Sequence, residues 1–197
     1  MQHPHSWSPD GQVIAFRDND PTTGFDSWVL PLSGERKPRV FLRTPFTDTG
    51  PKFSPDGRWL AYASDESGRL EIYVQPFPGP GAKTQISTDG GREPLWARNG
   101  ELFYRNGNRV MAVETKTQPV AQSAPSSGQP RFSAGAPQLL FEGPYDWGGP
   151  GTANYTVAPD GQRLVMVKAA GQEAAAAQIN VVLNWFEELK RRVPAGR

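Results

Sequence analysis

One short turn returns along this sequence at nearly regular intervals. SPDG occurs at 8–11 and again at 54–57, and looser versions, ARNG and APDG, occur at 97–100 and 158–161. Measured at the third turn position, successive spacings are 46, 43 and 61 residues. Serine, proline, aspartate and glycine fit the successive positions of a type I turn that ends in a left-handed glycine. A repeat in the mid-forties with several strands per unit is typical of β-propeller blades.

Each unit has the same internal order. An apolar strand leads into the turn, and three further segments follow it: in the first unit QVIAF, DSWVLPL and RVFLRTP, and in the second RWLAYAS, LEIYVQPF and KTQIST. Short segments rich in β-branched and aromatic residues, separated by turn residues, predict strands. We therefore predict an all-β fold, a β-propeller of four-stranded antiparallel blades. We expect the 197 residues to form one domain with about four blades, at about 5–46, 51–89, 93–142 and 153–183.

Two segments depart from the repeat. The widest spacing contains a segment rich in Pro, Ser and Gln at about 117–133, which predicts a flexible insertion. The last unit lacks a fourth strand and instead ends in NWFEELKRRV. Asn184 can cap this segment, basic residues follow at its end, and Pro194 stops it. We expect a short C-terminal helix at about 184–193 that packs against a blade edge.

The composition limits the classes of partner and chemistry that we expect for this chain. Lys and Arg total 21 and Asp and Glu total 20, so a net charge of +1 gives no electrostatic basis for binding nucleic acid. There is no cysteine, which excludes disulfides and thiol catalysis. This chain shows no signal peptide and no apolar run long enough for a transmembrane segment. A protein partner or a small ligand is the remaining expectation, and no cofactor is indicated.

The repeats resemble a known family. WSPDG and FSPDGRWLAYASDESGRLEIYV resemble the repeats of TolB-like and WD-like β-propellers, usually built with six blades. The run from PKFSPDG through STDGGREPLWARNGELFYRNGNRVMAVE to QINVVLNWFEELKRRV looks still more like the C-terminal propeller region of bacterial receptor-like serine/threonine kinases. Four units are present here, so the resemblance implies part of a six-bladed propeller or an arc that a second copy completes.

Catalytic and metal-binding patterns are missing from the sequence. The nucleotide loop and the H-R-D and D-F-G motifs of a kinase are absent, and so is the G-x-S-x-G elbow of a hydrolase. His3 and His5 are too few for a metal site without a third ligand, and we expect them in a mobile segment before the first blade. Asp18, Asn19, Asp20 and Asp26 are oxygen ligands suited to calcium, but their position favours a solvated hairpin loop. We predict neither an enzyme nor a metal site.

The links between blades are the best candidates for binding. In a propeller the SPDG turns lie on one side, and these links gather on the other side, around the channel mouth. The link EGPYDWGGPGTANY is long and contains Tyr145 and Trp147, while Arg92 and Glu93 begin a strand at the end of TDGGREPLW. Aromatic residues and arginine are common in binding hot spots. We predict a recognition site at Arg92, Glu93, Tyr145 and Trp147, although the same residues can also pack between blades or pair locally.

The expected function is a non-catalytic propeller module for protein interaction or ligand sensing, and the resemblance implies the sensor end of a bacterial serine/threonine kinase. Two alternatives stay open: a TolB-like periplasmic scaffold of the cell envelope, and the gating propeller of a prolyl-oligopeptidase-type serine peptidase. A homo-oligomer is a further expectation, because an open arc leaves apolar blade faces bare. The compartment is extracytoplasmic if the chain belongs to a receptor-like kinase, and otherwise cytoplasmic.

Overall fold

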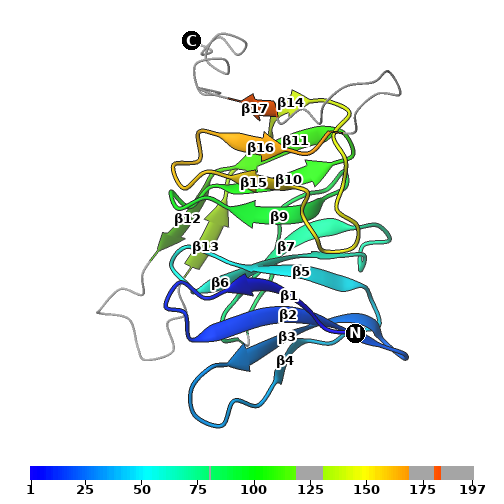
Figure 1. Cartoon of the computed structure of the whole chain (residues 1–197), viewed down its shortest axis with the longest axis vertical. Coiled ribbons are helices and arrows are strands. Elements are labelled where there is room, and N and C mark those ends of the chain that lie inside the picture. The colour runs from blue at the N-terminus through cyan, green and yellow to red at the C-terminus, as the bar shows by residue number, and fades with distance from the viewer. Residues whose placement is uncertain (80, 119–130, 169–179, 183–197) are drawn as a thin grey trace.

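The computed structural model describes residues 1–79, 81–118, 131–168 and 180–182. Over these ranges the chain is all β, and its sheets stack one above another from the first unit to the last (Figure 1). The predicted fold class is confirmed, whereas the predicted helix at 184–193 lies outside the described residues. Within the described residues, no helix has the length and hydropathy that a membrane span requires.

Four antiparallel sheets form blades 1 to 4. Blade 1 contains β1 (His3–Trp7), β2 (Val13–Asp20), β3 (Gly24–Pro31) and β4 (Arg39–Leu42). Blade 2 contains β5 (Asp48–Phe53), β6 (Trp59–Ser64), β7 (Glu71–Pro76) and β8 (Thr84–Gln85). Blade 3 contains β9 (Arg92–Trp96), β10 (Leu102–Asn106), β11 (Arg109–Val113) and β14 (Gln138–Glu142). Blade 4 contains β15 (Tyr155–Val157), β16 (Leu164–Met166) and β17 (Asn180–Val182).

Two segments differ from the sequence-based expectation. The ends of the insertion predicted at 117–133 are paired strands, because β12 (Thr115–Gln118) and β13 (Arg131–Ala134) form an antiparallel hairpin. Residues 119–130, between them, lie outside the described residues. The expectation that His3 and His5 belong to a mobile segment is wrong, because both lie in β1 and this strand pairs with β2.

The repeated turn forms as its residues predict. In blade 1 the amide of Gly11 donates to the carbonyl of Ser8 at 2.8 Å, and the glycine has a φ of 70°. The Ser8 hydroxyl accepts a hydrogen bond from the amide of Val13 at 2.9 Å. Ser54 and Gly57 repeat these contacts in blade 2. Each turn therefore fixes the register of the first two strands of its blade.

Apolar side chains between neighbouring blades form the core. One cluster joins blades 1 and 2, a second joins blades 2 and 3, and a third joins blades 3 and 4. They are built around Ala15, Val29, Phe53 and Leu60; around Trp59, Ala61, Ile72, Leu102 and Tyr104; and around Phe103, Val110, Tyr155, Leu164 and Met166. Each blade is thus held by the face it presents to its neighbour, as in repeat architectures.

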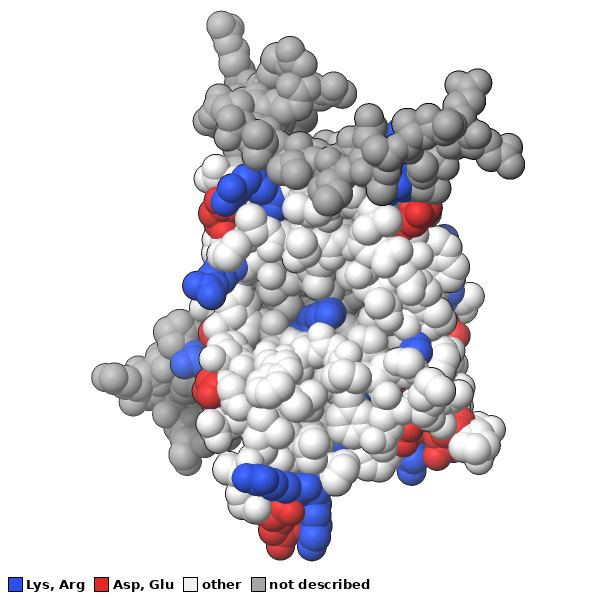
Figure 2. Space-filling model, viewed as in Figure 1, with Lys and Arg blue, Asp and Glu red and all other residues white. Residues whose placement is uncertain are grey.

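The antiparallel order of the strands sorts the connections into two sides. The repeated turns lie on one side, and the connections β4–β5, β8–β9 and β14–β15 lie on the other, which we call the link face. The connection β14–β15 comprises residues 143–154, and we call it the long link. In the view of Figure 2 the charged atoms lie mostly toward the margins, with basic atoms at the floor of a central hollow.

Candidate functional site

The structure brings the four predicted site residues together where β9 meets the long link. Arg92 and Glu93 begin β9, and Tyr145 and Trp147 lie in the long link. The Arg92 guanidinium carbon lies 5.0 Å from the centre of the Trp147 ring, within the range of a cation–π interaction. Trp147 is 55% exposed, so its ring is available at the surface. The pair therefore presents an exposed apolar ring surface next to a positive charge.

Glu93, the buried neighbour of Arg92 in β9, holds the long link in place. Its side chain is buried, and Oε1 accepts a hydrogen bond from the amide of Gly148 at 2.8 Å. The Glu93 backbone also accepts a hydrogen bond, from the hydroxyl of Tyr155 in blade 4 at 2.7 Å. Burial raises the pKa of the Glu93 carboxyl, although the Gly148 amide and the charge of Arg105 act in the opposite direction. Glu93 therefore joins β9, the long link and blade 4.

A β-bulge gives Glu93 this position. Arg92 pairs with Arg105 and Leu95 pairs with Phe103, so Glu93 and Pro94 both lie opposite Tyr104. The φ of Glu93 is 57°, a left-handed value that is unusual for a residue other than glycine. Strained backbone of this kind occurs where the surrounding structure holds it in place, often at functional sites.

Tyr145 differs from the other three residues. Its ring packs edge-on against Phe141 of β14, with 5.8 Å between ring centres, and contacts the core between blades 3 and 4. The Tyr145 carbonyl accepts a hydrogen bond from Arg105 Nη2 at 2.9 Å. Within the site, Tyr145 anchors the long link to the core, and Trp147, two residues later, is the aromatic side chain that reaches the surface.

Two buried arginines, which were not among the predicted site residues, also hold the long link. Arg105 of β10 donates to the carbonyls of Asp146 at 2.8 Å, and of Tyr145 and Gly107 at 2.9 Å. Arg17 of β2 donates to the carbonyl of Pro150. A signal was present in the sequence, because each arginine ends an otherwise apolar strand segment, IAFR and LFYR. A long side chain at that point can reach backbone carbonyls of the long link.

Blades 1 and 2 meet the far end of the long link at Gly151. A Cβ at this position would lie 2.8 Å from the Gly50 amide nitrogen and 3.1 Å from a ring carbon of His5. His5 is itself the extra residue of a bulge in β1. Burial, together with the positive charges of Lys52 and Arg17, lowers the His5 pKa to about 3. The long link therefore contacts blades 1, 2 and 3.

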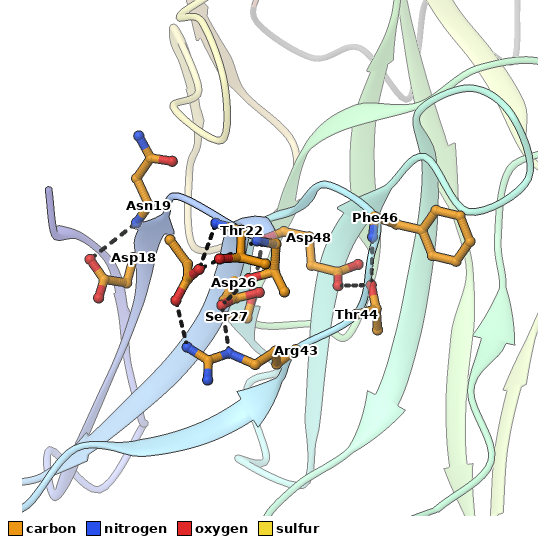
Figure 3. A network of polar contacts seen from close by, with 11 residues as sticks. Asp18, Asn19, Thr22, Asp26, Ser27, Arg43, Thr44, Phe46 and Asp48 are labelled. Atoms are coloured by element: carbon orange, nitrogen blue, oxygen red, sulfur yellow. Dashed lines mark hydrogen bonds and ion pairs between the residues drawn. The ribbon is translucent and has the colours of Figure 1, made fainter.

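The acidic loop considered for calcium forms a different structure (Figure 3). Arg43 Nε donates to Asp26 at 2.9 Å, and Arg43 Nη2 donates to Asp20 at 3.0 Å. The Thr23 hydroxyl donates to Asp26 as well, at 2.9 Å. Asp26 is fully buried, so the expected solvated loop is wrong for this residue. Arg43 takes the place of a cation, and no group of three or more metal-ligating side chains occurs among the described residues.

A small cavity of about 220 Å³ lies on the opposite side, between the repeated turns of blades 2 and 3. It is bounded by the two turns, Trp59, Trp96, Thr115 and Thr117. Ligand pockets usually range from about 300 to 1,000 Å³. The link face, with its exposed Trp147 and anchored backbone, is therefore the stronger candidate for recognition.

The chain is similar to parts of known proteins. No family model matches the chain. It is 31% identical over 121 residues to Tricorn protease homolog 1 of Streptomyces coelicolor, an alignment covering 60% of this chain and 10% of that protein. It is 37% identical over 73 residues to Dipeptidyl-peptidase 5 of Porphyromonas gingivalis, covering 34% of this chain and 11% of that protein. The chain thus spans about a tenth of the length of these relatives.

Among solved structures, TolB from Acinetobacter baumannii superposes with a TM-score of 0.62 at 19% sequence identity. The match covers 92% of this chain and 40% of the TolB chain. At this identity the likeness concerns the fold, and it agrees with the all-β blades described above. The chain therefore has a TolB-like β-propeller fold.

Proposed function

We propose that this chain is a non-catalytic recognition module whose binding site lies on the link face, with Trp147 and Arg92 at its centre. The observation that carries the proposal is the exposed Trp147 ring beside the Arg92 guanidinium, on a link that buried Glu93 and Arg105 hold in place. Tryptophan and arginine are the residue types most enriched in binding hot spots. A link that is already anchored loses little conformational entropy when it binds.

The chemistry of the pair suggests what it would bind. The indole supplies apolar contact area, and the guanidinium supplies donors for a carboxylate or a backbone carbonyl. A partner that presents an apolar side chain next to a carbonyl or carboxylate fits both groups. A peptide segment of a protein partner meets this description, and so does a small ligand of similar character.

The larger protein that contains such a module is part of the proposal. The run that begins at PKFSPDG and ends at QINVVLNWFEELKRRV resembles the C-terminal propeller region of receptor-like serine/threonine kinases. This resemblance supports a sensor role, with the catalytic half of the protein elsewhere. The likeness to TolB supports an envelope scaffold as an alternative. In either role the module binds its partner without carrying out chemistry itself.

The relatives support a second candidate function. Tricorn protease homolog 1 and Dipeptidyl-peptidase 5 are both peptidases by name. In this reading the chain is the propeller part of a peptidase and guides peptide substrates toward a catalytic domain. Such a module would bind unstructured peptides, whereas a sensor or scaffold would bind a folded partner or a small ligand.

The test uses ligands selected on the chain itself. A displayed library of random peptides and small folded domains is selected against the 197-residue chain, and the affinity of each selected ligand is measured for the wild type and for the variants Trp147→Ala, Arg92→Ala and Trp7→Ala. We expect Trp147→Ala to weaken binding about tenfold or more, as loss of a hot spot does. Arg92→Ala should weaken binding to a smaller degree.

Trp7→Ala is the matched control, because Trp7 is 61% exposed but lies beside a repeated turn, away from the link face. Both tryptophan variants should keep the circular dichroism spectrum of the wild type, since both side chains are exposed. Ligands that bind Trp147→Ala as tightly as the wild type would overturn the proposed site. A preference for unstructured peptides among the selected ligands would favour the peptidase reading over the sensor reading.

A further inference from the structure

The repeated turns meet directly at two of the three boundaries between blades. Between blades 1 and 2, a Cβ on Gly57 would lie 3.3 Å from Cδ of Pro9 in the preceding turn. Between blades 3 and 4, a Cβ on Gly161 would lie 2.8 Å from the preceding turn. Between blades 2 and 3, the described neighbours of a Cβ on Gly100 are two atoms of Thr115, both at 3.9 Å, and no atom of the preceding turn. The two turns are separated there, and the cavity of about 220 Å³ lies between them.

Blade 3 departs from the repeat next to this cavity. Its turn is ARNG, so Arg98 stands where the other three turns have proline. The turn is also one residue shorter, because the Ala97 amide bonds to the carbonyl of Glu101, whereas the Ser54 amide bonds to that of Trp59. In addition, blade 3 carries the β12–β13 hairpin, which the other blades lack within the described residues. Three departures from the repeat therefore occur at the same cavity.

The β12–β13 hairpin lies beside blades 2 and 3 and forms part of the cavity wall (Figure 1). The ring of Phe132 in β13 packs against Trp59 and Trp96, with 5.0 Å and 6.3 Å between ring centres. The hydroxyl of Thr117 in β12 accepts a hydrogen bond from Trp59 Nε1 at 3.1 Å, and Trp96 Nε1 donates to the carbonyl of Lys52 at 3.2 Å. Because both indole N–H groups are bonded within the protein, the two rings offer apolar surface to a ligand.

Two opposite charges line the cavity from neighbouring turns, Asp56 from blade 2 and Arg98 from blade 3. Asp56 Oδ1 accepts hydrogen bonds from the Ser54 hydroxyl at 2.6 Å and from the Arg58 amide at 3.1 Å, and Oδ2 takes no part in these bonds. Among the ion pairs of the described residues, none joins Asp56 to Arg98. A molecule that carries both an ammonium and a carboxylate group is complementary to this arrangement.

We propose that this cavity binds a free amino acid with an apolar side chain. The ammonium group contacts Asp56, the carboxylate contacts Arg98, and the side chain packs against the two indole rings. The cavity has room for about seven water molecules, so its ligand is smaller than the drug-sized molecules that occupy pockets of about 300 to 1,000 Å³. The site lies on the opposite side of the molecule from the link face and does not depend on what the link face binds.

The experiment compares ligands that differ by one charged group. Binding to the 197-residue chain is measured by isothermal titration calorimetry with leucine, phenylalanine, leucinamide, 4-methylpentanoate and glucose. Leucinamide lacks the carboxylate of leucine, and 4-methylpentanoate lacks its ammonium group. We expect saturable binding of leucine, phenylalanine or both, with each leucine analogue at least about tenfold weaker than leucine. Binding of neither amino acid, analogues that bind as tightly as leucine, or binding of glucose alone would overturn the proposal.

Two variants remove one charge each from the protein. Asp56→Asn keeps the turn, because Asn99 in blade 3 accepts the equivalent hydrogen bond, from the Glu101 amide at 3.0 Å. Arg98→Gln changes an exposed side chain and keeps the backbone of its turn. Each variant should bind the amino acid about tenfold more weakly or worse, while keeping the circular dichroism spectrum of the wild type. Wild-type affinity in both variants would overturn the proposal.

Asp160→Asn is the matched control, since it makes the same change in the turn of blade 4, and Asp160 does not line the cavity. Its affinity for the amino acid should equal that of the wild type. Trp147→Ala should also keep this affinity, because Trp147 belongs to the link face. Loss of amino-acid binding in Trp147→Ala would overturn the proposal by placing the ligand on the link face.

Discussion

Blades 1 and 3 hold the long link differently from blade 2. Arg17 and Arg105 occupy one equivalent position in blades 1 and 3, and both donate to carbonyls of the long link. Blade 2 has Ala63 at this position and instead meets the link where Gly50 faces Gly151. Two blades thus contact the link through long side chains, and the blade between them contacts it through close backbone approach.

The difference shows how a repeat acquires a site. The same bulge lies at the start of the inner strand in blades 2 and 3, and its left-handed position is Gly50 in one and Glu93 in the other, with φ values of 68° and 57°. Glycine adopts this conformation freely, whereas glutamate does so at a cost of about 1 kcal/mol. In blade 3 this backbone cost comes with a carboxylate that accepts a hydrogen bond from the long link. The repeat supplies the bulge, and the residue within it decides what the bulge does.

The largest expected effect comes from removing the arginine of blade 3. Arg105→Ala should lower the free energy of unfolding by about 3 kcal/mol, because the carbonyls of Tyr145, Asp146 and Gly107 lose a charged donor in a buried setting. Urea denaturation measures the change. Arg109→Ala is the control, since this arginine is exposed and pairs with Glu142 at the surface, where about 0.5 kcal/mol is expected. Equal effects at the two positions would show that the long link adds no stability.

The contact with blade 2 is tested at the glycine of the link. Gly151→Ala should cost about 2 kcal/mol, because its Cβ would crowd the Thr49 hydroxyl and the Gly50 amide, at a φ of 73°. Gly149 also has a positive φ, of 84°, but a Cβ there meets nothing within 4 Å. Gly149→Ala therefore isolates the backbone cost, about 1 kcal/mol. The difference between the two variants in thermal or urea unfolding measures the contact with blade 2.

Much of the fold could be predicted from the repeated turn, because each letter of SPDG has a fixed role in the hairpin. The four predicted site residues also meet in space, since a strand start and a long link on the same side of a propeller are neighbours. Two features gave no comparable signal. Which aromatic residue of the link faces the core depends on packing against Phe141. The left-handed backbone of Glu93 depends on the bulge, which is a property of strand pairing.

The equivalence of the two arginines was hidden by a one-residue change. If blades are aligned on the turn glycine, Arg105 matches Tyr62 of blade 2, and Arg17 matches Ala63. The turn of blade 3 is one residue shorter, since the Ala97 amide bonds to the carbonyl of Glu101, four residues on, instead of five. A one-residue shift exchanges the two faces of a strand. Only the observed pairing places both arginines at one position.

The strained bulge predicts an order between two substitutions at one residue. Glu93→Ala removes the hydrogen bond to Gly148 and keeps the left-handed backbone, whereas Glu93→Gly removes both the bond and the backbone cost. We expect the alanine variant to lose about 2 kcal/mol and the glycine variant about 1 kcal/mol. Hydrogen exchange of the Gly148 amide should be faster in both. A glycine variant less stable than the alanine variant would argue against strain at this residue.

The last comparison concerns the dependence of stability on pH, for which the bulges of blades 1 and 3 should have opposite signs. The His5 pKa is lowered to about 3 by burial and the nearby Lys52 and Arg17, so its contribution is present above pH 6.5 and is lost as the pH falls from 6.5 toward 3. Burial raises the Glu93 pKa above its usual 4.5, so the fold favours the protonated form and stability falls as the pH rises above 4.5. His5→Asn should reduce the loss of unfolding free energy as the pH falls below 6.5. Glu93→Gln should reduce the loss of unfolding free energy as the pH rises from 4.5 toward neutral. Urea denaturation between pH 4 and 7 measures both slopes, each less than about 1.4 kcal/mol per pH unit. If both variants changed the slope of unfolding free energy against pH in the same direction, the two bulges would not have opposite effects on the pH dependence of stability.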